Sequence, residues 1–168
     1  MKNKLIKYSL IFLALMVAGL FISYFRSSKH ETTPELRPLH RITGEVINAD
    51  EWKGKRKVLY FWATWCGVCR LNLPLFKNAY SFLGSNSNTL LLSIEEGGSG
   101  KEALKTYMEK NQIHFPVYIA GKNLLENWKV EGFPTTIYLN EKDEVKFIDI
   151  GILNPFTFYF RYFLLAFL

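Results

Sequence analysis

Short hydrophobic runs alternate with segments of helical period along most of the chain. Residues 58–63 and 89–94 are rich in β-branched and aromatic side chains, which is typical of buried strands. Between them, residues 71–83 repeat apolar positions at intervals of three and four, which predicts a helix that contains Pro74. Further strands are predicted over residues 115–120, 135–139 and 145–150, with a small hairpin around Gly44 and a helical turn or two over residues 123–128.

Two more helices are predicted from residues that are typical of helix N-termini. Ser99 and Glu102 have the spacing of a capping box, so a helix is expected from there to about Asn111. Asn154 followed by Pro155 predicts the start of a final helix that continues to the C-terminus. The resulting order of strands and helices predicts an α/β domain with a mixed central sheet flanked by helices.

The final helix is apolar on nearly every side. One stripe is expected to pack against the sheet: Phe156, Phe160, Phe163, Leu164 and Phe167. Apolar residues also fall on the other faces: Phe158, Tyr159, Tyr162, Leu165 and Leu168. With Arg161 as its only charge, this helix suggests the hypothesis of contact with a bilayer surface or a membrane partner, and packing within the fold alone is the alternative.

The N-terminal segment has a different composition from the rest. Residues 8–25 carry no charge and are long enough to cross a bilayer, with Lys2, Lys4 and Lys7 before them. A cleaved signal peptide is the competing interpretation, but no small-x-small site follows the run. We therefore predict three parts: a cytoplasmic tip and transmembrane anchor (1–26), a linker (27–38) and a folded domain (39–168).

The charge balance says little about partners once the anchor is set aside. The formal charge is +6, but removing Lys2, Lys4, Lys7 and Arg26 leaves 17 basic against 15 acidic side chains. Nucleic acid is therefore not implied as a partner. The basic residues before the apolar run favour an N-terminus in the cytoplasm and a domain outside.

The only two cysteines, Cys66 and Cys69, stand directly after the first strong strand signal. The helical period begins just after Cys66, which places that thiol at or just before a helix N-terminus. Unsatisfied N–H groups and the helix dipole lower a thiol pKa there and favour the thiolate, and Arg70 adds positive charge nearby. The pattern predicts an attacking thiol at Cys66 and a better shielded, resolving thiol at Cys69.

Other uses of a two-cysteine pair remain open. Two soft thiolates can hold Cu(I), so a metal carrier is an alternative function for the same pair. A four-ligand zinc site lacks a second Cys or His pair, since His30, His40 and His114 are scattered. We therefore predict no metal site and no cofactor beyond a redox-active Cys66–Cys69 disulfide.

Three features together resemble the thioredoxin fold. They are Trp62-Ala63-Thr64-Trp65-Cys66-Gly67-Val68-Cys69, Pro74 five residues after the second cysteine, and Gly132-Phe133-Pro134-Thr135-Thr136 ahead of a strand. More narrowly, residues 39–168 resemble the membrane-anchored TlpA/ResA-like branch. The Cys-Gly-Val-Cys form, with this length and anchor, is similar to the D protein of suppressor-of-copper-sensitivity systems (ScsD-like).

The resemblance implies roles for particular residues. Cys66 would be the nucleophile, Cys69 the resolving cysteine and Trp65 the flanking aromatic residue. Pro134 would be a cis-proline facing the disulfide, and the backbone of Phe133 would pair with an extended substrate segment. Gly67 and Val68, without the histidine that marks oxidising relatives, favour a reductase.

Two positions depart from these relatives. Tyr60 stands where thioredoxins carry a buried aspartate, and Asn72 stands where ResA-like proteins often place a glutamate. Water, the leaving thiolate or another carboxylate must then take the proton of Cys69. Glu95 and Glu96 at the end of the neighbouring strand are the nearest candidates by topology, and exposed loop charge is the alternative interpretation for both.

The function that follows is a membrane-anchored protein-disulfide oxidoreductase of the bacterial inner membrane, single-pass and monomeric, with its catalytic domain in the periplasm. The resemblance implies a DsbD-like or ScsB-like transmembrane electron donor. Copper or redox stress tolerance, repair of damaged disulfides, and thiol reduction in cytochrome c maturation are all compatible with these residues. The absence of an acidic residue directly after Pro134 disfavours the cytochrome role.

Overall fold

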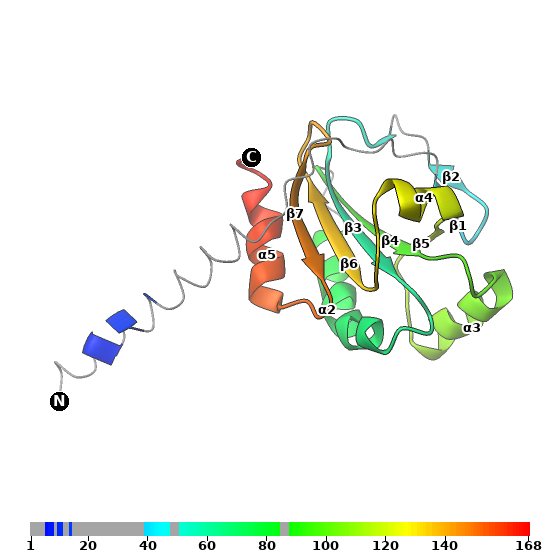
Figure 1. Ribbon diagram of the computed structural model, residues 1–168, viewed down its shortest axis with the longest axis horizontal. Coiled ribbons are helices and arrows are strands. Elements are labelled where there is room, and N and C mark those ends of the chain that lie inside the picture. Colours follow the sequence, from blue (N-terminus) through cyan, green and yellow to red (C-terminus); the bar gives the residue numbers. More distant parts are fainter. Residues whose placement is uncertain (1–5, 9, 12–13, 15–38, 48–50, 85–87) are drawn as a thin grey trace.

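The computed structural model describes residues 6–8, 10–11, 14, 39–47, 51–84 and 88–168 of the 168-residue chain. Its described strands form one sheet in the order β2-β1-β5-β4-β3-β6-β7 (Figure 1). The strands are β1 (Leu39–Arg41), β2 (Val46–Ile47), β3 (Arg56–Trp62), β4 (Thr89–Glu95), β5 (Val117–Ile119), β6 (Thr135–Leu139) and β7 (Val145–Ile150). The helices are α2 (Gly67–Leu83), α3 (Lys101–Lys110), α4 (Lys122–Asn127) and α5 (Pro155–Leu164).

The central strand β3 brings distant segments to one edge of the sheet. It runs parallel to β4, with Trp62 opposite Glu95, and antiparallel to β6, with Phe61 opposite Thr135. Parallel strands end at the same edge, and the antiparallel β6 begins there. The cysteine motif after β3, the end of β4 and the segment before β6 therefore meet at this edge.

Side-chain alternation along β3 divides the interior into two layers. Val58, Tyr60 and Trp62 belong to a core that also contains buried residues of α2, α3 and α5. Leu59 and Phe61 belong to a second core on the opposite face, which α4 covers. All five side chains are buried, because a strand with helices on both faces has no solvent side.

The predicted α/β architecture is confirmed. The sheet is mixed, the hairpin lies around Gly44, and the strands over 135–139 and 145–150 have the predicted bounds. The remaining predicted strands differ at their ends: the one expected over 115–120 is confined to Val117–Ile119, because Pro116 has no N–H to donate to a ladder.

The capping box predicted for α3 is wrong. The helix begins at Lys101, and its N-cap is Gly100, which has a φ of 77° and makes no side-chain cap. The Ser99 hydroxyl instead hydrogen-bonds the Thr64 hydroxyl and donates to Glu95 Oε1 at 3.4 Å. The turn of the backbone at Gly97 and Gly100, both at positive φ, directs Ser99 toward the β3–α2 loop.

The predicted faces of the final helix are also wrong. Phe158, Tyr162 and Leu165 are buried, whereas the stripe expected in the core is exposed apart from Leu164. The Asn154 side chain caps the helix, and Phe158 packs on Tyr138 with ring centroids 6.1 Å apart. These two contacts set the rotation of α5, which ends at Leu164 and not at the C-terminus.

The predicted anchor over residues 8–25 and the linker over 27–38 lie for the most part outside the described residues. None of the helices in the described part of the chain has the length and hydrophobicity needed to span a bilayer. The division into anchor, linker and domain stays a prediction.

Candidate active site

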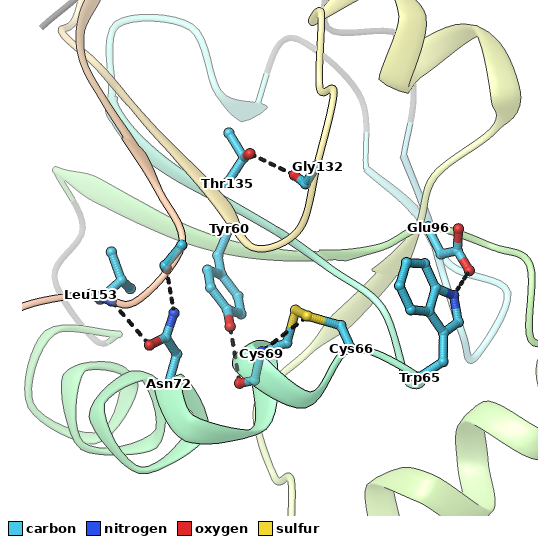
Figure 2. The surroundings of a disulfide bond; sticks show 10 residues. Tyr60, Trp65, Cys66, Cys69, Asn72, Glu96, Gly132, Thr135 and Leu153 are labelled. Atoms are coloured by element: carbon cyan, nitrogen blue, oxygen red, sulfur yellow. Dashed lines mark hydrogen bonds between the residues drawn. A yellow bond between two sulfur atoms is a disulfide. The ribbon is translucent and has the colours of Figure 1, made fainter.

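A disulfide joins Cys66 and Cys69 at the N-terminus of α2, with their Cα atoms 5.2 Å apart (Figure 2). Cys66 is the N-cap residue, and its Sγ accepts a hydrogen bond from the Cys69 N–H at 3.0 Å. Cys66 is 5% exposed and Cys69 1%. The structure therefore places Cys66 ahead of the helix and Cys69 within its first turn, where the protein covers it more completely.

The buried strand β3 fixes where this helix begins. After Trp62 the chain makes a tight turn in which the Cys66 N–H donates to the Ala63 carbonyl at 3.2 Å. Gly67 and Val68 then open α2 as exposed residues, and Arg70 is exposed on its first turn. The predicted strand-to-helix junction at the cysteines is confirmed.

Tyr60 occupies the position of the thioredoxin aspartate. It is fully buried, stacks on Phe76 at 4.7 Å, and donates from its hydroxyl to the Cys69 carbonyl at 3.3 Å. Burial raises the pKa of this phenol, more than the hydrogen bond with Asn72 lowers it. Tyr60 therefore keeps its proton at neutral pH and orients the first turn of α2 without acting as a base.

Asn72 occupies the position of the ResA-type glutamate and is also buried. Its Nδ2 donates to the Gly151 carbonyl at 3.1 Å, and its Oδ1 accepts from the Leu153 N–H at 3.0 Å (Figure 2). The amide thereby connects α2 to the segment between β7 and α5. A carboxylate could not donate to Gly151, which gives a structural reason for an amide at this position.

Trp65, Phe133 and Pro134 lie beside the disulfide at the same edge of the sheet. The exposed Trp65 indole packs edge-on against Phe133, with ring centroids 5.8 Å apart. Its Nε1 donates to Glu96 Oε1 at 2.5 Å. The Phe133–Pro134 peptide bond is cis, as the resemblance implies. Within the described part of the chain, neither peptide group of Phe133 has a hydrogen-bond partner.

Glu95 is buried at the end of β4, so exposed loop charge does not describe it. Its Oε2 accepts from the Gly97 N–H at 2.8 Å. Burial raises its pKa above 4.5, and hydrogen bonds from Gly97, Ser99 and Thr64 only partly offset that rise. The charge of Glu96 raises it further. Glu95 thus contacts the Thr64 segment before Cys66, and its role as proton acceptor for Cys69 stays a prediction.

We expect Glu95 to make stability depend on pH. Because its folded-state pKa lies above 4.5, folding favours the protonated form; this contribution is complete below pH 4.5 and is lost as pH rises through the folded pKa. Glu95→Gln should flatten that fall in the free energy of unfolding, measured by urea denaturation between pH 4.5 and 8. Glu131→Gln, at an exposed position, is the matched control and should leave the wild-type slope. An unchanged slope in Glu95→Gln would contradict the assignment.

Several contacts around the disulfide have no counterpart in the sequence analysis. They are the hydrogen bonds of Tyr60, Asn72 and Thr64, and the bond from Trp65 to Glu96. Each joins residues from separate elements, so no local pattern could have indicated it. In the described part of the chain, no three His, Cys, Asp or Glu residues gather as a metal-binding group.

Comparison with known proteins assigns the chain to a protein family. The Redoxin family model matches residues 30–157. The chain belongs to the Redoxin family. It is 28% identical to sporulation thiol-disulfide oxidoreductase A of Bacillus subtilis over 149 residues, covering 84% of this chain and 89% of that one. It is also 28% identical to the thiol-disulfide oxidoreductase ResA of the same organism over 117 residues, covering 69% and 64% of the two chains.

Solved structures agree with the family. The crystal structure of StoA from Bacillus subtilis superposes with a TM-score of 0.66 at 26% identity, covering 77% of this chain and 97% of that one. The prediction of a thioredoxin-like protein-disulfide oxidoreductase related to ResA is confirmed. For this Redoxin-family protein, the Cys66–Cys69 disulfide is accordingly the candidate active site.

Proposed function

We propose that this Redoxin-family protein is a membrane-anchored reductase of protein disulfides that works on the outer side of the bacterial inner membrane, in the periplasm. The observation that carries the redox part is the Cys66–Cys69 disulfide at the N-terminus of α2, beside the unpartnered peptide groups of Phe133. The uncharged run over residues 8–25, with lysines before it, supports the anchor and its orientation.

The chemistry begins with the reduced pair. The Cys66 thiolate attacks one sulfur of a substrate disulfide, which forms a mixed disulfide and releases the other substrate sulfur as a thiolate. In the reduced state, the Cys69 N–H that donates to Cys66 Sγ would favour the attacking thiolate. Cys69 then attacks Cys66 Sγ, which releases the second substrate thiolate and closes the disulfide seen in the structure. Two electrons have passed to the substrate.

Substrate binding would use the edge of the sheet beside the disulfide. The free N–H and C=O of Phe133 can pair with an extended substrate segment, as an added strand does. The exposed Trp65 ring, held by Glu96 and Phe133, supplies an apolar wall next to Cys66. Trp65, Phe133 and Pro134 are therefore our substrate-binding candidates.

A reductase needs a fresh supply of electrons after each turnover. We assign that supply to a DsbD-like or ScsB-like transmembrane donor with a reduced dithiol, which would transfer two electrons to Cys66–Cys69 by the same exchange in reverse. The absence of a histidine between the cysteines supports this direction. Within the branch, the ScsD-like pattern supports a place in copper or redox stress tolerance, with no cofactor beyond the disulfide.

Trapping tests this function. In Cys69→Ser the second attack is removed, so substrates should stay bound to Cys66 as mixed disulfides. The tagged full-length variant, isolated under acid quench from its own host, should yield partners that dithiothreitol releases and mass spectrometry identifies. The Cys66→Ser/Cys69→Ser double variant is the control. Equal recovery from both variants would contradict disulfide reduction by this protein.

A further inference from the structure

The outer face of α5 carries a row of exposed phenylalanine rings, here called the aromatic stripe: Phe156, Phe160, Phe163 and Phe167. Their exposed fractions are 86%, 41%, 58% and 84%. The spacing of four, three and four residues places them along one side of α5 and its C-terminal turn. Contiguous apolar patches of this kind on a soluble domain mark an interaction surface.

The inner face of the same helix holds its charge. Arg161 is buried, pairs with Asp149 of β7, and lies over the Phe147 ring at 5.2 Å. A solvent-facing helix normally turns its charges outward and its large rings inward. In α5 the single charge is inside and neutralised, while the four phenyl rings of the stripe, three on α5 and one just after it, face out. Burial of a phenylalanine side chain away from water is favourable, so the exposed stripe favours contact with an apolar surface.

The start of α5 lies close to the helix that carries the cysteines. Asn72 of α2 donates to the Gly151 carbonyl at 3.1 Å and accepts from the Leu153 N–H at 3.0 Å, just before α5 begins. Ile152, between these two residues, is also exposed. The N-terminal end of the aromatic stripe is therefore the end nearest the first turn of α2, which contains Cys69. In Figure 1, α5 lies at the outside of the sheet beside β7.

The chain itself indicates what covers this surface. The uncharged run ends at residue 25, and the 12-residue linker over 27–38 can extend at most about 40 Å. An anchored domain would therefore stay within one domain diameter of the bilayer. The bilayer would then be the apolar surface that is always available to the aromatic stripe. A stripe with no exposed charge suits burial at the boundary of headgroups and acyl chains.

We propose that the aromatic stripe lies in the interface of the bilayer that holds residues 8–25. This inference rests on the anchoring in the proposed function. The helix would then lie along the membrane, and its N-terminal end, nearest the disulfide, would hold Cys66 close to the membrane surface. A dithiol presented there is within reach of a donor whose own redox centre sits in the membrane.

Photocrosslinking in vesicles tests the proposal with the full-length protein. p-Benzoylphenylalanine replaces Phe163 or, separately, Phe156, in protein reconstituted into phosphatidylethanolamine–phosphatidylglycerol vesicles. Replacement of Phe82, which is 79% exposed on α2, is the matched control. After irradiation, mass spectrometry should show lipid adducts several-fold more abundant at positions 163 and 156 than at position 82.

The other outcomes overturn the proposal. Equal lipid labelling at all three positions, adducts between two copies of the chain, or no adduct at 163 and 156 would each do so, as would a chain that fails to sediment with the vesicles. Insulin disulfide reduction is assayed on the same vesicles. An inactive preparation that still shows lipid adducts at 163 and 156 would contradict the reductase function and leave the membrane contact standing.

Discussion

Replacing Cys66 with serine is expected to abolish disulfide reduction, while Cys69→Ser should retain the first half of the reaction. A serine hydroxyl stays protonated at neutral pH and cannot form a disulfide, so Cys66→Ser loses both the nucleophile and the bond it makes. Cys69→Ser keeps the N-cap thiol and the backbone N–H that hydrogen-bonds it.

The difference is measured with the reduced variants and a chromogenic aromatic disulfide in stopped flow. Cys69→Ser should react rapidly and stoichiometrically at one thiol per chain. Cys66→Ser should react at least about tenfold more slowly, because Cys69 is the more buried residue and lacks the N-cap position. Phe82→Ala, at an exposed position near the other end of α2, is the control and should keep wild-type turnover of insulin. Equal rates for the two cysteine variants would contradict the assignment of attacker and resolver.

Asp149→Ala is expected to lower the free energy of unfolding more than the other substitutions proposed for this protein. Asp149 Oδ1 pairs with buried Arg161, and its Oδ2 accepts from the Tyr138 hydroxyl at 2.9 Å. Removing the carboxylate leaves the guanidinium and the phenol without that partner in the interior. Breaking a buried ion pair from one side costs about 3–5 kcal/mol, a large share of the total of roughly 5–15 kcal/mol for a native domain.

Urea denaturation followed by circular dichroism measures this loss. Glu102→Ala breaks the exposed pair with Lys105 and is the matched control, with an expected change within about 0.5 kcal/mol. Adding Arg161→Met to Asp149→Ala should recover part of the stability, because the buried charge is then gone. A loss of less than about 1 kcal/mol in Asp149→Ala would mean that the pair is solvated and does not hold α5 on the sheet.

The prediction for Asp149 rests on a feature that the sequence did not indicate. In the pattern of α5, nearly every position is apolar, so hydrophobicity gives no contrast between faces. A lone arginine on a helix normally faces solvent, whereas the structure turns Arg161 inward to Asp149 on β7. Helix rotation was decided by Asn154, Phe158 and Arg161 through contacts with distant residues, and the predicted core stripe became the exposed one.

The surroundings of the disulfide show the same limit. From the sequence, Glu95 could be an exposed loop charge and Ser99 the cap of a helix, yet Glu95 is buried and Ser99 contacts Thr64. Glu96 holds the Trp65 indole across 31 positions of sequence. The predicted strand order correctly placed the end of β4 near the cysteine loop. The individual hydrogen bonds of this segment depend on backbone turns at Gly97 and Gly100, which the strand order does not show.

Local sequence patterns were sufficient to predict the α/β order, the buried central strand and the place of the cysteine pair at a strand-to-helix junction. These features are encoded locally, in runs of apolar residues, in helical period and in a two-residue spacing. The exposed face of α5, the hydrogen bonds by which Asn72 and Tyr60 hold α2 in place, and the burial of Glu95 became known only from the three-dimensional fold. Such outcomes depend on contacts between residues far apart in the chain, which no local pattern records.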